Sequence, residues 1–217
     1  MDQNRLNQQS NYWEDNFFSK PKMFGLDPSI AAISSLKKFK DENIDEIVEL
    51  GAGLGRDTIF FAENKIKVEA LDYSPTAIKI IEKKAKENNF SKLISTKNFD
   101  VRGELPYEDN SIKGVFSHML YCKALTNSDI EKLNNEIFRI LKPGGMNIYT
   151  VRNFNDGDYM RGAHIGEEMY ENDGFIINFF SEKKVNGLLE GFKNLSITNF
   201  EEGNFPRKLF LIQNKKL

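Results

Sequence analysis

The chain has 217 residues, of which 40% are hydrophobic and 29% charged, and its formal net charge at pH 7 is −2. This length can bury one substantial core and is short for two domains. The charge lacks the basic excess of a nucleic-acid-binding protein, and no apolar run reaches the length of a membrane span. A single cysteine, Cys122, fits a reducing compartment, and the N-terminus has no apolar signal-peptide core. We therefore expect a cytoplasmic protein that binds neither nucleic acid nor membranes.

Residues 1–28 are polar but contain interleaved aromatic residues, and we expect them to form a separate helical segment. Their aromatic side chains are Tyr12, Trp13, Phe17, Phe18 and Phe24. The plainest interpretation is that these side chains cover one edge of the core. Residues 29–217 are expected to form a single domain, which opens with an amphipathic helix that carries Ile30, Ile33, Leu36 and Phe39.

The sequence is organised around residues 49–58, ELGAGLGRDT, a glycine-rich turn between two apolar segments. We expect Ile44–Val48 to form a short buried strand, and Ile59–Ala62 to begin a helix. The three glycines can adopt positive φ angles and carry no Cβ, so the backbone can approach a ligand closely. The helix that follows offers its positive N-terminus to a negatively charged group.

The spacing of the glycines indicates which ligand the turn binds. A dinucleotide fingerprint, G-x-G-x-x-G, requires a glycine where Arg56 stands, and a phosphate-binding P-loop requires a lysine that does not follow. An NAD-dependent oxidoreductase is therefore disfavoured. The acidic residue before the turn, Glu49, and the G-x-G-x-G run instead resemble the first motif of class I S-adenosylmethionine-dependent methyltransferases. In that family the turn lies against the methionine part and the ribose of the cofactor, and many small members use an N-terminal segment as a lid over it.

A second strand is expected at residues 66–70, where apolar and polar residues alternate. It runs into Asp72, and Ser74 and Pro75 have the residue types that cap a helix and begin it. Asp72 would then stand at the carboxyl end of the second strand, about 20 residues beyond the start of the glycine turn, where an acid binds ribose hydroxyls. The alternative is a surface acid beside a helix, and the pairing with the glycine turn favours ribose binding.

A third strand is expected at Leu93–Phe99, and the residues after it extend the resemblance. The segment 105–112, LPYEDNSI, is similar to a family segment that follows this strand. The resemblance implies that Asp100 meets the adenine amino group and that the backbone of Val101 meets the adenine ring. Lys113 departs from the pattern, because an acid usually precedes the fourth strand; this change lies away from the cofactor.

The fourth strand, Val115–Ser117, is followed by His118 and lacks the Asn/Asp-Pro-Pro-aromatic motif of adenine and glutamine methyltransferases. This absence counts against DNA and amide nitrogens as acceptors. Residues 128–131, SDIE, have the form of a capping box and should open a helix that ends at residues 142–145, KPGG. The run LKPGG before a fifth strand, Met146–Arg152, is a second signature of the family. It and the compact size resemble the small-molecule branch, including tellurite-resistance-type methyltransferases.

Residues 153–180 break the pattern, and we expect a long loop-like insertion on the crevice side. Ser181 should cap a helix that extends to Phe192. Leu195–Phe200 and Lys208–Ile212 should then form a hairpin across a turn at 203–206. The expected fold class is therefore α/β, a Rossmann-like three-layer sandwich whose mostly parallel seven-stranded sheet ends in a C-terminal antiparallel hairpin.

The resemblance implies that the chain binds S-adenosylmethionine and transfers its methyl group to a small-molecule acceptor by in-line displacement, leaving S-adenosylhomocysteine. The alternative is a non-catalytic sensor or regulatory protein that binds the same cofactor. We expect a monomer or homodimer. The residues expected to bind the cofactor are Trp13, Glu49, Gly51, Ala52, Gly53, Gly55, Arg56, Asp57, Asp72, Tyr73, Ser74, Asp100, Val101 and Ser117.

The acceptor should lie beyond the methyl group, where the fourth and fifth strands and the insertion converge. The candidate catalytic residues there are His118, Tyr121, Arg152 and His164, with Arg207 from the hairpin. Two arginines and two histidines would favour an anionic or lone-pair-rich acceptor. Alternatively, the arginines pair with acids such as Glu167, Glu168 or Glu201 and only brace the insertion. Two histidines without matched acids do not predict a metal site.

Overall fold

A computed structural model of the chain describes residues 3–203 and 207–217. The strands of its main sheet are β1 (Glu46–Leu50), β2 (Lys67–Asp72), β3 (Ile94–Asn98), β4 (Ile112–Ser117), β5 (Leu141–Arg152), β9 (Phe192–Glu202) and β10 (Arg207–Lys216). The helices are α1 (Gln3–Ser19), α2 (Ile30–Asp41), α3 (Arg56–Glu63), α4 (Pro75–Glu87), α5 (Asn127–Ile140) and α6 (Glu182–Asn186). A smaller sheet contains β6 (Ala163–Gly166), β7 (Met169–Asn172) and β8 (Phe175–Asn178).

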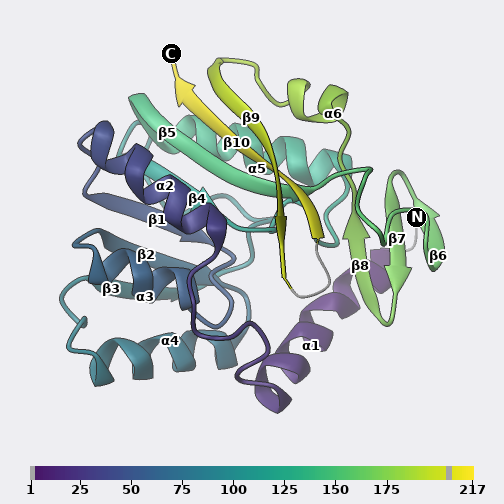
Figure 1. The fold of residues 1–217 in the computed structure, drawn as a ribbon, viewed down its shortest axis with the longest axis horizontal. Helices are drawn as coiled ribbons and strands as arrows, with labels where there is room; N and C mark the ends of the chain where they lie inside the picture. The colour runs from purple at the N-terminus through teal and green to yellow at the C-terminus, as the bar shows by residue number, and fades with distance from the viewer. Residues whose placement is uncertain (1–2, 204–206) are drawn as a thin grey trace.

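The main sheet has the strand order β3-β2-β1-β4-β5-β10-β9 (Figure 1). Strand β10 runs antiparallel to both of its neighbours, β5 and β9, and the other neighbouring strands pair in parallel. The carboxyl ends of the parallel strands therefore meet at one edge of the sheet. The expected Rossmann-like sheet with a C-terminal antiparallel hairpin is confirmed; the predicted turn between its strands lies, from residue 204 to 206, outside the described residues.

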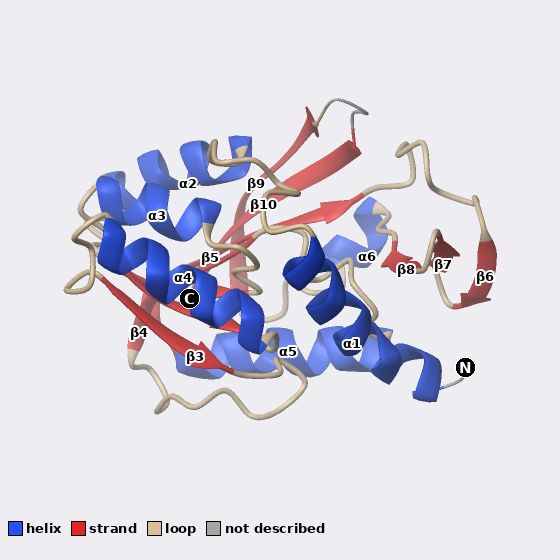
Figure 2. Cartoon of the chain, turned by 90° about the horizontal axis from the view of Figure 1, so that it is seen from below, coloured by secondary structure: helices blue, strands red, loops and turns tan. Residues whose placement is uncertain are grey.

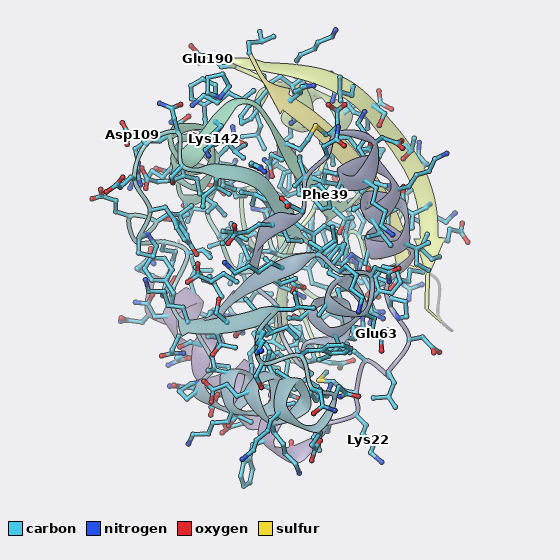
Figure 3. All side chains as sticks on the ribbon, turned by 90° about the vertical axis from the view of Figure 1, so that its left-hand side faces the viewer. Lys22, Phe39, Glu63, Asp109, Lys142 and Glu190 are labelled. Atoms are coloured by element: carbon cyan, nitrogen blue, oxygen red, sulfur yellow. The ribbon has the colours of Figure 1, made fainter. Side chains whose placement is uncertain are left out.

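Two hydrophobic cores lie on opposite faces of the sheet, because neighbouring residues of a strand point to opposite sides. On β1, Ile47 belongs to the core beneath α2, α3 and α4, whereas Val48 belongs to the core beneath α5. Figure 2 shows α2, α3 and α4 on one side of the sheet and α5 on the other. Phe39 of α2 reaches into the first core and is fully buried, as its place inside the fold in Figure 3 illustrates. The three-layer sandwich follows from this arrangement.

Most helix boundaries follow from local capping chemistry. Ser74 accepts a hydrogen bond from the backbone N–H of Ala77, and Pro75 is the first residue of α4, as expected. The capping box of α5 is formed by Thr126 and Asp129, so the prediction that it starts at Ser128 was wrong by two residues. The sequence SDIE fits the capping-box pattern, with Ser128 as its first residue. In the structure, however, Thr126 is the N-cap residue, and its hydroxyl bonds to Asp129, three residues later.

The C-terminal part differs in detail from the expectation. Ser181 does cap α6, but this helix ends at Asn186 and does not extend to Phe192, which already begins β9. The expected loop at 153–180 contains the three-stranded antiparallel sheet β6-β7-β8, so the prediction of a loop-like insertion was wrong for residues 163–178. Its strands are only four residues long, and such short strands carry a weak periodic signal. None of the described helices is long and apolar enough to cross a membrane.

Helix α1 bridges the main sheet's edge and the small sheet. Glu14 accepts hydrogen bonds from Ser74 and Thr76 at the start of α4, and the Tyr12 hydroxyl donates to the carbonyl of Asp173 between β7 and β8 at 2.7 Å. Arg5 forms an ion pair with Glu171 of β7 at 2.6 Å. Figure 2 shows α1 between α4 and the small sheet. The N-terminal helix is therefore anchored on both sides of the carboxyl edge of the main sheet.

Candidate functional site

A pocket with about 800 Å³ of empty space lies at the carboxyl ends of β1, β2 and β4 and is covered by α1 and the segment after it. Parallel α/β sheets place their ligands at this edge. The residues that line it are Trp13, Phe17, Phe24, Glu49, Gly51, Ala52, Gly53, Leu54, Arg56, Asp57, Asp72, Tyr73, Phe99, Val101, His118, Met119, Leu120 and Lys123.

The glycine turn forms the floor of this pocket. Gly51, Gly53 and Gly55 have φ angles of +70°, +53° and +75°, which favour glycine. A Cβ on Gly53 would stand 3.7 Å from Phe17 and 3.8 Å from Phe24, so it would occupy space between the floor and the roof. A Cβ on Gly55 would instead lie 2.6 Å from Ile81 of α4. Gly53 thus leaves room for a ligand, and Gly55 lets the turn pack on α4.

Asp72 ends β2 and is held by two backbone N–H groups, from Gly53 at 2.8 Å and from Ser74 at 2.9 Å. Its side chain lines the pocket, and burial raises the pKa of Asp72 to about 6. Glu49 lies nearby, accepts a 2.5 Å hydrogen bond from the Thr58 hydroxyl, and is almost fully buried. Burial, together with the neighbouring Asp57, raises the pKa of Glu49 well above its usual range. The pocket therefore presents acceptor oxygens that suit hydroxyl or ammonium donors.

The roof of the pocket is aromatic. Trp13 and Phe17 from α1 lie with ring centroids 5.4 Å apart, and Phe24 lies 6.3 Å from Trp13 and 6.2 Å from Phe17. The guanidinium of Arg56, from the start of α3, donates to the carbonyl of Phe24 and pairs with Glu202 of β9 at 2.6 Å. The segment over the pocket is thus tied to the glycine turn and to the C-terminal hairpin.

His118, directly after β4, is held at the other end of the pocket. Its Nδ1 lies 3.0 Å from the hydroxyl of Thr150, and that hydroxyl oxygen already accepts the backbone N–H of Met119. The Thr150 oxygen can also accept the Nδ1–H of a neutral imidazole, and in that tautomer the free lone pair of the ring is on Nε2. Nε2 lies 3.6 Å from the Glu202 carboxylate and has no hydrogen-bond partner within the described part of the chain. Burial opposes the charge of Glu202, but His118 and Arg56 lower its pKa to about 2.

The comparisons with known proteins agree with this architecture. Residues 47–145, from β1 to the LKPGG run, match the family described as "Methyltransferase domain". A solved S-adenosylmethionine-dependent methyltransferase from Methanosarcina mazei superposes with a TM-score of 0.70 at 22% identity, over 80% of this chain and 92% of that one. Residues 47–145 therefore carry the methyltransferase-domain match, and the solved structure shows that the fold is that of class I S-adenosylmethionine-dependent methyltransferases. The expected resemblance to this family is therefore confirmed, and S-adenosylmethionine is the cofactor of the family.

The chain is also similar to a curated wheat methyltransferase and to a second solved methyltransferase. Phosphoethanolamine N-methyltransferase 1 of Triticum aestivum is 41% identical over 102 residues, which are 46% of this chain and 20% of that protein. The chain spans only about a fifth to a quarter of the length of the two curated wheat relatives that it matches. A methyltransferase of Burkholderia thailandensis, solved with 1,6-didemethyltoxoflavin and S-adenosylhomocysteine, has a TM-score of 0.70 at 15% identity, over 98% of this chain and 86% of that one. At this identity the likeness shows the fold.

Ten of the residues expected to bind the cofactor line this first pocket, and four do not. Those that line it are Trp13, Glu49, Gly51, Ala52, Gly53, Arg56, Asp57, Asp72, Tyr73 and Val101. Asp57 also has a structural task, because its two carboxylate oxygens accept the backbone N–H and the hydroxyl of Ser29 at the start of α2.

The four that lie outside the pocket have other partners. Gly55 packs on Ile81, and the Ser74 hydroxyl is engaged with α4 and Glu14. Ser117 is fully buried within β4. Asp100 turns to Arg102, whose guanidinium donates to it at 2.6 Å, and lines a smaller neighbouring pocket of about 410 Å³. These four residues do not line the first pocket, and their part in binding the cofactor stays a prediction.

The expected catalytic residues are largely dispersed. Only His118 lines the pocket; Tyr121 is fully buried and stacks on Tyr149 with ring centroids 4.3 Å apart. His164 is exposed on β6, where its Nε2 lies 2.8 Å from the carbonyl of Glu167. The prediction that Tyr121 and His164 border the acceptor was therefore wrong. Residues 120–122 turn back into the core after β4, and β6 belongs to the separate small sheet.

Arg152 is buried and braces the start of the insertion. Its guanidinium pairs with Asp156 and, at 2.6 Å, with Asp158. Burial opposes the charge, but these two acids raise the pKa of Arg152 above its ordinary value. Arg152 thus pairs with acids, as the bracing alternative expects, but its partners are not Glu167, Glu168 or Glu201. Arg207 is exposed, and both arginines line a second pocket beside the first.

Sequence reasoning missed Lys123, Glu202 and Met119 as neighbours of the site. Lys123 lies six residues beyond the end of β4 and lines both pockets, with its ammonium 4.4 Å from the centre of the Trp13 ring. The sequence did contain a signal for Lys123, because a basic residue shortly after a strand that ends at the crevice can line the site. Within residues 3–203 and 207–217, no three Asp, Glu, His or Cys side chains converge in a way that could hold a metal ion.

Proposed function

We propose that the chain is a methyltransferase that binds S-adenosylmethionine in the first pocket and methylates a small-molecule acceptor. The observation that carries this proposal is the contact between the buried Asp72 carboxylate and the backbone of Gly53, at the floor of a pocket roofed by α1. The acid at the end of β2 suits the ribose hydroxyls of this cofactor. The glycine floor leaves room for its methionine part, and the aromatic side chains suit its adenine ring. The residues present therefore fit it.

Each part of the pocket would hold a different part of the cofactor. Asp72 would accept hydrogen bonds from the ribose hydroxyls, and the floor around Gly51 and Gly53 would lie against the methionine part. Tyr73 and Val101 would flank the adenine. The N-terminal helix would act as the lid, with Trp13 and Phe17 facing the bound molecule. We thus propose residues 1–28 as a lid on a single domain formed by residues 29–217.

When bound, S-adenosylmethionine supplies an activated methyl group on its sulfonium. An in-line displacement then asks the protein mainly to align the acceptor and to exclude water. The aromatic roof excludes water, and His118 can accept a proton from an acceptor that carries one. The small-molecule acceptor is supported by the second, adjoining pocket and by relatives that act on phosphoethanolamine and 1,6-didemethyltoxoflavin. A tellurite-resistance-type acceptor, a cytoplasmic location and a monomeric or homodimeric state stay predictions.

Replacing Asp72 by Asn is expected to weaken S-adenosylhomocysteine binding by about 1.5–3 kcal/mol, roughly 10- to 150-fold, because two charge-assisted hydrogen bonds lose their charge. Isothermal titration calorimetry measures this. Wild-type affinity should fall as the pH drops through about 6, where Asp72 takes up a proton, and the Asn variant should lack this step. Asp45→Asn, an exposed acid paired with Lys113, serves as the matched control. Equal affinities of Asp72→Asn and the wild type for S-adenosylhomocysteine would refute the assignment. The wild type is expected not to bind NAD.

The lid predicts a spectroscopic signal, because Trp13 is the single tryptophan of the chain and lines the pocket. Its fluorescence should change on saturation with S-adenosylhomocysteine. Deletion of residues 1–20 should lower the affinity by about tenfold or more, since aromatic contacts of the roof contribute about 0.5–1.5 kcal/mol each. The remainder should stay folded by circular dichroism. A truncated protein that is folded and binds with full affinity would show that α1 only packs on the core.

A further inference from the structure

A second pocket adjoins the first and has about 800 Å³ of empty space. Four residues line both pockets, so they form the boundary between them: Trp13, Phe24, Met119 and Lys123. The far wall of the second pocket is formed by β8 and is apolar, with Phe175, Ile176 and Ile177. A molecule in this pocket would therefore have an apolar body between α1 and β8, with one end at the boundary to the first pocket.

Lys123 is the cation at that boundary. It is half-buried, and its ammonium donates no hydrogen bond to any residue that the structure describes; the contact recorded for it is the face of the Trp13 ring. Burial lowers the pKa of Lys123 to about 8; the neighbouring Cys122 and Asp72 raise it, and the nearby Arg152 and Arg207 lower it. An ammonium held away from water without a counter-ion is unfavourable, and an anionic ligand would relieve this.

The other charged residues around the second pocket are less suited than Lys123 to pair with an anionic ligand. The charge of Arg152 is already balanced by Asp156 and Asp158, and Asp158 is the inner acid of the pocket. Arg207 and Asp173 are both exposed and stand at the mouth. Within the described chain, Lys123 is thus the inner cation of this pocket that no acid neutralises.

We propose that the second pocket takes an acceptor that carries an oxyanion, a carboxylate or a phosphate, on an apolar body, and that Lys123 pairs with this oxyanion. The inference rests on the proposed function, because the methyl acceptor must lie next to the cofactor pocket. Arg207 adds long-range attraction at the mouth. Lys123 would then select anionic acceptors over neutral ones of the same shape.

The test uses the full chain saturated with S-adenosylhomocysteine and three probes of similar size: benzoate, phenyl phosphate and the neutral benzamide. Calorimetry should show that benzoate or phenyl phosphate binds about tenfold tighter than benzamide, as one charge-assisted contact implies. Whichever of the two anions binds better identifies the oxyanion. Lys123→Met should remove the preference and Lys123→Arg should keep it. Lys22→Met, a change at an exposed lysine on the outer edge (Figure 3), is the matched control and should also keep it.

Several results would overturn the inference: no binding of either anion, benzamide binding as tightly as benzoate, or an unchanged preference in Lys123→Met. A loss of S-adenosylhomocysteine affinity in Lys123→Met would also overturn it, because Lys123 would then serve the cofactor. The cofactor titration of the wild type is performed first. Its failure would count against the proposed function itself, whereas normal cofactor binding without an anion preference would count only against the acceptor class.

Discussion

Arg152→Met is expected to lower the free energy of unfolding by about 3–5 kcal/mol, because it leaves a buried carboxylate without its counter-ion. Both Arg152 and Asp156 are buried, and the Arg152 Nε donates to Asp156 at 3.0 Å. Asp156 also accepts the backbone N–H of Lys208 at 2.9 Å, so this carboxylate joins the end of β5 to the start of β10. Urea denaturation followed by circular dichroism measures the loss.

A second variant separates the buried charge from the lost packing. The double variant Arg152→Met, Asp156→Asn removes both charges, so it should recover much of the stability that the single variant loses. Arg152→Lys should fall between wild type and Met, because an ammonium cannot reach both acids as the planar guanidinium does. If Arg152→Met lost less than about 1 kcal/mol, the ion pairs would be exposed in solution and would not brace the insertion.

The cofactor half of the molecule was predictable because its signals are local. The turn of residues 49–58 needs glycine for its positive φ angles, and the alternation in β2 places Asp72 at the strand end whatever the rest of the chain does. The parallel order of β1, β2 and β4 then brings these features to one edge. The side-chain positions of Ser74 and Asp100 were less predictable. Both residues lie in the loops after β2 and β3 as expected, but their side chains bond to Glu14 and Arg102.

The acceptor half was less predictable because tertiary contacts decide it. Tyr121 stacks on Tyr149, a residue 28 positions away on β5, and no spacing rule reveals such a pair. Lys123 contacts the ring of Trp13 on α1, which comes from the other end of the chain. The acids that neutralise Arg152, in contrast, lie four and six residues after it, and this local signal was available in the sequence.

His118→Ala is expected to lower turnover by about 10²- to 10⁴-fold, the usual contribution of a positioned general base, with S-adenosylhomocysteine affinity largely retained. The reason is geometric: His118 lines the cofactor pocket, and Thr150 and Glu202 orient its two ring nitrogens. A proton taken up from the acceptor would give an imidazolium beside the Glu202 carboxylate, which stays charged because its pKa is about 2. Turnover is measured with labelled cofactor and any acceptor that a screen of small molecules identifies.

Two variants control for this interpretation. His164→Ala removes the other histidine, which is exposed on β6 outside the pocket, and should leave turnover unchanged. Glu202→Gln keeps a hydrogen-bonding group but removes the charge that stabilises the imidazolium, so it should lower turnover less than His118→Ala does. Full turnover in His118→Ala would mean that the acceptor needs no base from this residue. The protein's contribution would then be reduced to aligning the acceptor and excluding water.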